Sequence, residues 1–324
     1  MEYTQLGHTD LQVSRIAFGT WSFGGDWGPV EAEESRRAIH KALELGINLF
    51  DTAQAYGFGA SETILGEALQ AEVKHHRPAV VLATKGGLRQ QGGQLVRDAS
   101  PAWLRQGLEA SLRALGTDYI DLYQVHWPDP HTPFEETAAA LDSFVREGKV
   151  RYVGVSNFDA SQMAKFEQTR KLDTLQPPYH LFRREAEETV FPYCLEHGIG
   201  VLIYGPLAHG LLTGKYTADA VFRADDWRSK SELFHGEALR RNLRVVERLK
   251  QFAESREIAL SQLAIAWTLA HPAVDVAIVG ARTPGQIEQT APAAEIHLTP
   301  QDLADIEHLM REAATVGGPS PESV

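Results

Sequence analysis

Cysteine is almost absent from this chain, because Cys194 is the single cysteine in 324 residues. An intramolecular disulfide is therefore impossible, and a thiol redox motif or a cysteine-built zinc site has no basis. A reducing cytoplasm fits this composition best. The adjacent pair His75-His76 is also a poor metal site, since neighbouring side chains diverge, so we expect both on the surface and no bound metal.

Long apolar runs and an excess of positive charge are missing as well. Nowhere do eighteen apolar residues follow one another, and the segment 1–10 has no basic stretch followed by an apolar one. We therefore expect neither a membrane span nor an export signal. The net charge of −12 disfavours broad binding of nucleic acid or anionic lipid. A site for phosphate must then be a local pocket, and the expected partner is a small molecule.

The glycine-rich loops of common nucleotide-binding folds are also lacking. No G-x-G-x-x-G sequence follows an apolar run, and its nearest imitation, Gly57-Phe58-Gly59, has no third glycine. A doubly wound dinucleotide domain is therefore disfavoured. The segment Gly210 to Lys215 is too short for an NTPase phosphate loop, and Tyr216 stands where Ser or Thr would bind magnesium. A kinase or NTPase function is rejected.

What the sequence does contain is a regular alternation of apolar runs and helix-period segments. The runs are Arg15 to Gly19, Asn48 to Asp51, Val80 to Lys85, Asp121 to His126, Tyr152 to Ser156, Asp173 to Gln176, Gly200 to Tyr204 and Val274 to Gly280. The helical segments are Glu34 to Leu45, Ser61 to Leu69, Pro101 to Leu115, Phe134 to Glu147, Ser161 to Thr169, Glu185 to His197 and Leu239 to Glu254. This rhythm predicts a parallel sheet, closed as a (β/α)8 TIM barrel in the α/β class.

The ends of the chain and the helix starts refine this prediction. We expect one domain over residues 1–316 and a flexible tail over 317–324. The segments Glu2 to Gln5 and Leu11 to Val13 predict a hairpin that closes the bottom of the barrel. Hydroxyl residues before proline, at Thr132, Thr283 and Thr299, predict capped helix starts and an extra C-terminal helix.

Polar residues with chemical potential stand at the ends of the apolar runs. Asp51, Lys85 and His126 end three successive runs, and Tyr56 follows Asp51 on the same loop. The C-terminal strand ends of such a barrel share one mouth. A tyrosine can donate a proton near neutral pH if an ammonium stabilises its phenolate. Each residue alone is more often a structural partner, but together they predict one active site.

Several motifs around these residues resemble the aldo-keto reductase superfamily. They are Asp51-Thr52-Ala53-Gln54-Ala55-Tyr56-Gly57, Ala83-Thr84-Lys85, Gln124-Val125-His126-Trp127, Gly154-Val155-Ser156-Asn157-Phe158, Gln176-Pro177-Pro178-Tyr179, Gly210-Leu211-Leu212-Thr213-Gly214-Lys215 and Gly280-Ala281-Arg282. The stretches Tyr56-Gly57-Phe58-Gly59 and His126-Trp127-Pro128-Asp129-Pro130 most resemble the bacterial general stress protein type. The resemblance covers nearly the whole chain.

This resemblance implies NADPH-dependent reduction of aldehydes or ketones, with Tyr56 as the acid, Lys85 and Asp51 tuning it, and His126 orienting the carbonyl. The implied cofactor contacts are Gly19, Thr20, Trp21, Asp51, Ser156, Asn157, Gln176, Tyr204, Gly205, Leu207, Leu212, Lys215, Gly280, Arg282, Gln286 and Gln289. Ser156 and Asn157 could instead cap the following helix. Arg282 would bind the adenosine 2′-phosphate, which favours NADP over NAD, although a solvated surface arginine is the alternative. Thr290 stands where the family commonly has asparagine.

The substrate side is predicted to be aromatic. Trp21, Trp27, Phe58 and Trp127 lie on or beside strand-end loops, so they are expected to wall the carbonyl pocket, with core packing as the alternative. A different function class also stays open. The β subunits of potassium channels resemble the same fold, bind NADPH and act mainly as regulatory partners. Appreciable turnover of simple aldehydes would favour the enzyme.

Overall fold

Eight parallel strands close into a barrel in the computed structural model, which describes residues 1–25, 31–217, 220, 222 and 227–314. Around the barrel their order is β10, β11, β12, β3, β4, β5, β8, β9. The strands are β3 (Ile16–Gly19), β4 (Leu49–Asp51), β5 (Val81–Gly86), β8 (Ile120–Val125), β9 (Val150–Ser156), β10 (Thr174–Gln176), β11 (Gly200–Tyr204) and β12 (Val276–Gly280). Each predicted apolar run forms one of them, so the predicted (β/α)8 barrel is confirmed.

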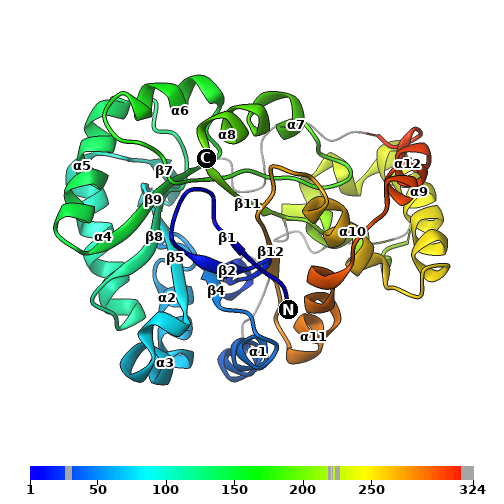
Figure 1. Ribbon diagram of the computed structural model, residues 1–324, viewed down its shortest axis with the longest axis horizontal. Helices are drawn as coiled ribbons and strands as arrows, with labels where there is room; N and C mark the ends of the chain where they lie inside the picture. Colours follow the sequence, from blue (N-terminus) through cyan, green and yellow to red (C-terminus); the bar gives the residue numbers. More distant parts are fainter. Residues whose placement is uncertain (26–30, 218–219, 221, 223–226, 315–324) are drawn as a thin grey trace.

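Helices surround the ring of strands (Figure 1). They are α1 (Ala32–Glu44), α2 (Ala60–Ala68), α3 (Gln70–His75), α4 (Pro101–Leu115), α5 (Phe134–Arg146), α6 (Ala160–Glu167), α7 (Ala186–Thr189), α8 (Phe191–His197), α9 (Gly236–Glu254), α10 (Leu260–Leu269), α11 (Pro284–Thr290) and α12 (Pro300–Met310). In α1, Ala38, Ile39 and Ala42 are buried, as their helical spacing predicts. In the described part of the chain, no helix combines the length and apolarity that a membrane span needs.

The predicted helix from Glu185 to His197 is in fact two helices. The first, α7, ends at Thr189, and α8 starts at Phe191 with Pro192 in its first turn. Proline has no backbone N–H to donate to the preceding turn, and its ring crowds that turn's carbonyl group. The apolar residues keep their helical spacing across Val190, but Pro192 interrupts the backbone hydrogen bonds of the helix.

The barrel interior is filled from its closed end. Strands β1 (Tyr3–Gln5) and β2 (Gln12–Ser14) pair as an antiparallel hairpin, which Figure 1 shows in blue across the barrel. Leu6, Leu11 and Val13 of this segment pack with the inward-facing strand residues, such as Leu122 and Leu202. The predicted hairpin at the bottom is therefore confirmed, and it leaves the opposite end of the barrel for chemistry.

A second hairpin lies outside the predicted elements. Strands β6 (Leu88–Gln91) and β7 (Gln94–Arg97) pair directly after β5. Gly92 and Gly93, with φ of 60° and 81°, make its two-residue turn. Such a turn needs positive φ at both positions, which glycine adopts at little cost. This hairpin was not predicted because its strands are mostly polar and show no clear apolar alternation. The Gly-Gly pair between two short segments could have indicated its turn.

The predicted hydroxyl caps form at one of three places. Thr299 and Asp302 exchange hydrogen bonds in a capping box at the start of α12. Thr132 instead donates to Asp129 Oδ2 over 2.7 Å, and Pro133 takes the cap position of α5. Asp129, three residues earlier in the chain, takes the Thr132 hydroxyl, so that cap was predicted wrongly. Thr283 occupies the predicted cap position of α11 but lacks the cap hydrogen bond. The predicted tail, residues 317–324, lies outside the described residues.

Candidate active site

A buried ion pair forms the centre of the barrel mouth. Lys85 Nζ donates to Asp51 Oδ1 over 2.6 Å and to the backbone oxygen of Thr52 over 2.9 Å. The side chains of Lys85 and Asp51 are only 1% and 4% exposed. Lys85 points inward because inward and outward positions alternate along β5. A charge so deeply buried needs its partner and these hydrogen bonds, so the pair is held in one geometry.

Tyr56 completes this group from the turn after β4. Its hydroxyl lies 3.4 Å from Lys85 Nζ, as the third contact of the ammonium. Its ring meets the imidazole of His126 edge-on, with centroids 5.6 Å apart and an interplanar angle of 80°. The four residues that the sequence predicts as catalytic are therefore adjacent. An ammonium beside a phenol favours the phenolate, which makes proton donation from the phenol easier.

His126 is fixed through its backbone at the end of β8. Its amide N–H donates to the Gly86 carbonyl over 2.9 Å, and its own carbonyl accepts from Asn157 Nδ2 at 3.1 Å. The residue is 2% exposed. Both neighbouring strand ends, β5 and β9, thus hold the position from which the imidazole faces Tyr56.

A chain of side-chain hydrogen bonds joins the far side of the barrel to this centre. Gln176 Nε2 donates to Asp51 Oδ2 over 2.9 Å, and Ser156 Oγ donates to the Gln176 carbonyl over 2.8 Å. Asn157 Nδ2 donates to Ser156 Oγ over 3.0 Å, and Tyr204 OH donates to Asn157 Oδ1 over 2.8 Å. These hydrogen bonds orient the amide and hydroxyl groups that the family resemblance implies as cofactor contacts.

The alternative role of Ser156 and Asn157, as helix caps, is not what the structure shows. Helix α6 is capped by Asp159, whose side chain accepts from the Gln162 backbone in a capping box. Asn157 instead adopts a left-handed φ of 62°, a conformation that asparagine tolerates better than most residues. Both side chains are therefore committed to the barrel mouth.

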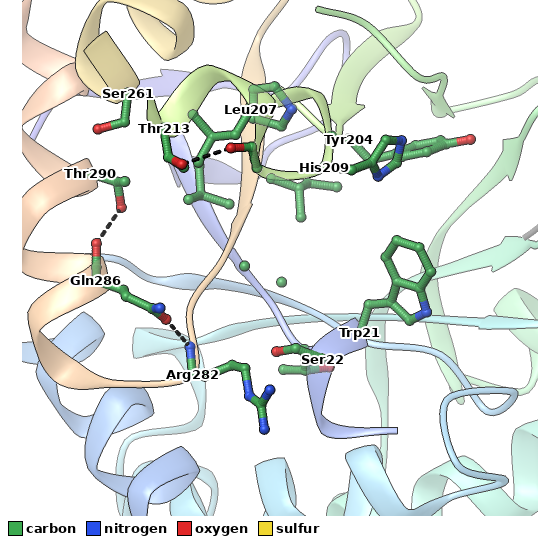
Figure 2. A pocket seen from close by; sticks show the side chains of 18 of the residues that line it. Trp21, Ser22, Tyr204, Leu207, His209, Thr213, Ser261, Arg282, Gln286 and Thr290 are labelled. Atoms are coloured by element: carbon green, nitrogen blue, oxygen red, sulfur yellow. Dashed lines mark hydrogen bonds between the residues drawn. The ribbon is translucent and has the colours of Figure 1, made fainter. Parts of the chain in front are cut away.

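A pocket of about 550 Å³ opens beside this centre (Figure 2). Of the predicted cofactor contacts, the following line it: Gly19, Thr20, Trp21, Asp51, Gln176, Tyr204, Gly205, Leu207, Lys215, Gly280, Arg282, Gln286 and Gln289. Tyr56 also lines it. In Figure 2, Trp21, Tyr204 and His209 stand on one side of the pocket, and Gln286, Thr290 and Ser261 stand on the other.

Ser156, Asn157 and Leu212 are the predicted cofactor contacts that do not line this pocket. Ser156 is 1% exposed and stands behind Gln176, and Asn157 stands behind Tyr204. Leu212 is fully buried in the main apolar core. Ser156 and Asn157 instead form hydrogen bonds with Gln176 and Tyr204, which do reach the pocket.

Several pocket residues were not predicted from the sequence. His209 belongs to the short helix η3 (Ala208–Thr213), has a left-handed φ of 55°, and meets Trp21 edge-on at 6.3 Å between centroids. Arg228, from η4 (Trp227–Lys230), donates to Tyr216 OH over 2.7 Å. Ser22, Pro206, Gly210, Thr213, Ser261, Ile278 and Val279 also line the pocket. No periodic or motif signal marks Arg228, since it lies in the long segment between β11 and α9.

Cations gather at this pocket although the chain as a whole is acidic. Lys215, Arg228 and Arg282 all line it. Partial desolvation and then the charge of Arg228 lower the pKa of Lys215. Arg282 follows β12, and its backbone N–H donates to Gln286 Oε1 over 2.7 Å. A local group of cations within a chain of net charge −12 suits an anionic ligand.

Thr290, at the end of α11, lines the same wall. Its Oγ1 donates to the Gln286 carbonyl over 3.0 Å, as the dashed line in Figure 2 marks. The hydroxyl is thus engaged with its own helix. An amide side chain, which the sequence resemblance leads one to expect at this position, would reach further into the pocket.

The aromatic residues predicted for the substrate are spread over different places. Trp21 lines the pocket, with its ring centroid 6.5 Å from that of Tyr56. Trp127 is 8% exposed and lies under the Arg97 guanidinium, 5.0 Å from the ring centroid. Phe58 is 52% exposed and lines a separate hollow over α2 and α4. Trp27 lies outside the described residues.

Comparison with known proteins agrees with this geometry. Residues 15–311 match the Aldo/keto reductase family. The chain belongs to this family. A relative, the aldo-keto reductase YhdN of Bacillus subtilis, is 44% identical over 96% of this chain and 94% of its own length. The NADH-specific methylglyoxal reductase of Escherichia coli is 36% identical over 97% of this aldo/keto reductase and 98% of its own length.

A solved structure and a relative of another kind complete the comparison. The glycerol dehydrogenase AKR11B4 from Gluconobacter oxydans superposes with a TM-score of 0.89, at 37% identity, over 98% of both chains. A probable voltage-gated potassium channel subunit beta from Arabidopsis thaliana is 34% identical over 96% of this aldo/keto reductase and 97% of its own length. The two bacterial reductases are more similar in sequence to this chain than the channel subunit is, which favours an enzyme over a regulatory subunit. This aldo/keto reductase is an oxidoreductase that uses a nicotinamide cofactor and acts on small carbonyl compounds.

Proposed function

We propose that this enzyme reduces aldehydes or ketones with NADPH and that Tyr56 supplies the proton. One observation carries the proposal: the Tyr56 hydroxyl is the third neighbour of a buried ammonium that Asp51 already holds. The ammonium stabilises the phenolate that remains after proton donation, and the low exposure of the pair strengthens this effect. The reaction is reversible, so the same phenolate would accept the proton of an alcohol.

The residues of the pocket fit a nicotinamide dinucleotide. Gln176 stands beside the catalytic centre with an amide, and three cations lie elsewhere along the same pocket. An amide suits the carboxamide of nicotinamide, and cations suit phosphate groups. When bound, the cofactor supplies hydride to the carbonyl carbon. Ser156 and Asn157 would hold the nicotinamide side of the site, and Lys215 with Gly205 and Leu207 the diphosphate.

The chain's own residues would then manage the proton and the developing charge. His126 would orient the carbonyl oxygen by a hydrogen bond, and Tyr56 would donate its proton to that oxygen. Lys85 would stabilise the phenolate, while Asp51 keeps the ammonium in place. Trp21, which lines the pocket beside Tyr56, would exclude water from this space.

The preference for NADPH over NADH is carried by Arg282. Arg282 lines the pocket and stands two residues before α11 begins at Pro284. A planar donor fork near the positive end of a helix suits a 2′-phosphate. The single cysteine, Cys194, fits a reducing cytoplasm as the location. Because one relative is a probable channel subunit, both turnover and cofactor binding should be measured.

A Tyr56→Phe variant tests the proposal. It keeps the ring that packs against His126 and removes only the hydroxyl, so NADPH binding should persist while kcat falls by at least about 100-fold. Stopped-flow NADPH oxidation over a set of aldehydes and ketones measures the loss, and quenching of protein fluorescence measures binding. Tyr3→Phe, in the hairpin at the closed end, is the matched control. Turnover of Tyr56→Phe at the parental rate would refute the assignment, and binding without turnover in the parent would favour the regulatory function.

A further inference from the structure

Glu62 is a buried carboxyl group that the proposed mechanism does not use. It lies in the first turn of α2 and is 1% exposed. Thr84 Oγ1 donates to its Oε1 over 2.6 Å. Thr84 is fully buried and directly precedes Lys85 on β5. Successive side chains point to opposite faces of a strand, so Thr84 faces α2 while Lys85 faces the barrel interior.

The same helical turn also holds the backbone of Tyr56. The Ser61 N–H donates to the Tyr56 carbonyl over 3.2 Å. The Ser61 hydroxyl contacts Thr20 Oγ1 at 2.7 Å and Thr52 Oγ1 at 3.1 Å. The first turn of α2 is therefore joined to Tyr56, to the residue after β3 and to the residue after β4. Glu62 adds the link to β5.

We propose that Glu62 is a positioning residue: by holding Thr84, it sets the distance between the Lys85 ammonium and the Tyr56 hydroxyl. Tyr56 is hydrogen-bonded to the first turn of α2, which carries Glu62, whereas Lys85 belongs to β5. The bond from Thr84 to Glu62 ties these two bodies together on the outer side of the strand. The contact that it controls, 3.4 Å between Lys85 Nζ and Tyr56 OH, is the longest in the ammonium's set and the one that catalysis needs. The proposal rests on the proposed function of Tyr56.

Burial makes the Glu62 carboxyl group easier to protonate than an exposed one. Burial raises its pKa, while the hydrogen bond from Thr84, the nearby Ser111 hydroxyl and then the charge of Lys85 act in the opposite direction. Burial and then the charge of Glu62 raise the pKa of Tyr123, which lies on β8. A neutral carboxyl group can accept from Thr84 without competing with Asp51 for the ammonium. A glutamine, which has the same shape and an acceptor oxygen, should therefore replace it with little loss.

Three variants test the inference. Glu62→Gln should keep the parental kcat within about twofold, whereas Glu62→Leu and Thr84→Val should lower it by about 10- to 100-fold, because misplacement of about 1 Å at a catalytic group has that cost. Lys85 would then stabilise the phenolate less well. The pH at which reduction declines should move to higher values in both variants, since that decline reports the acid. Glu67→Gln, on the exposed face of α2 where Glu67 pairs with Arg36, is the control.

Two measurements separate this inference from its alternatives. Fluorescence titration with NADPH and thermal unfolding show whether each variant is folded and binds cofactor. If Glu62→Leu and Thr84→Val lose stability but keep the parental pH profile, Glu62 is structural only and the inference is overturned. Loss of kcat in Glu62→Gln as large as in Glu62→Leu would also overturn it. Failure of the proposed function itself is recognised separately, as full turnover in Tyr56→Phe.

Discussion

Gln176 Nε2 donates to Asp51 Oδ2 over 2.9 Å, although the two residues are 125 positions apart in the chain. The other oxygen of the same carboxylate accepts from Lys85. One buried carboxylate therefore connects the residue that we assign to the nicotinamide amide with the residue that we propose tunes Tyr56. In the proposed mechanism, cofactor binding and proton donation would share this group, so substitution of Gln176 should affect both.

Replacing Gln176 by methionine should weaken both functions. The variant keeps the length of the side chain but removes the donor to Asp51 and the amide. We expect the Kd for NADPH to rise by about tenfold or more, the equivalent of one to two hydrogen bonds, together with a lower kcat. Fluorescence titration and steady-state kinetics measure the two effects. Gln70→Met, at an exposed site on α3, is the control. An unchanged Kd would show that Gln176 does not contact the cofactor.

Arg282→Ala should change the choice between the two nicotinamide cofactors. Arg282 would contact only the additional phosphate of NADPH, so its loss should raise the Kd of NADPH by about 10- to 100-fold, the cost of a charge-assisted hydrogen bond. The Kd of NADH should stay nearly constant. Titration with both cofactors gives the ratio, and Arg146→Ala, at a site on α5 where the side chain is 73% exposed, is the control. Equal weakening for both cofactors would exclude Arg282 as the selecting residue.

Gly154→Ala should destabilise the barrel directly beneath the catalytic layer. A Cβ atom at Gly154 would stand 2.0 Å from Thr174 Oγ1 and 3.0 Å from the Thr174 carbonyl oxygen. Overpacking of this kind costs about 1–3 kcal/mol. Gly285→Ala, on α11, meets nothing within 4 Å and should instead stabilise by about 0.4–1 kcal/mol. Urea unfolding compares the two. A stable Gly154→Ala protein would mean that β9 and β10 can separate without cost.

Asp302→Asn should remove stability that depends on pH. Hydrogen bonds from Thr299, then the Arg256 guanidinium, lower the pKa of Asp302 to about 2. Because the folded-state pKa lies below the ordinary 3.8, the stabilisation is present above that ordinary value and disappears as the pH falls toward 2. The variant should lose about 1 kcal/mol at neutral pH, as for a helix cap, and almost nothing in strong acid. Urea midpoints at both pH values check this, with Asp305→Asn as control; a loss independent of pH would contradict it.

Much of the fold followed from local pattern. The eight apolar runs became the eight barrel strands, and α4 runs from Pro101 to Leu115 as predicted, because apolar period and proline at the first helical position report local backbone preference directly. The errors arose where a neighbour intervened. Pro192 divides one helical pattern, Asp129 takes the Thr132 hydroxyl, and the polar hairpin β6–β7 carries little apolar signal.

The candidate site divides in the same way. The order of Asp51, Tyr56, Lys85 and His126 along the chain predicted a shared mouth, because parallel strands bring their C-terminal ends to one edge. The inclusion of Arg228 and His209 in the pocket could not be predicted, since their positions depend on how the long segment after β11 folds back. The conformation of such a segment depends on packing against residues far away in the chain, so its sequence shows no helical or strand period.

The sequence by itself determined which residue types stand at the strand ends, and hence the barrel, its mouth and the chemistry available there. Only the tertiary structure decided which atoms of these residues meet: Asp51 accepts hydrogen bonds from both Lys85 and Gln176, and Glu62 accepts one from Thr84, the neighbour of Lys85 on β5. The physical reason is range. Strand and helix preferences act over a few residues, whereas a hydrogen bond between residues far apart in the chain exists only after the barrel has closed.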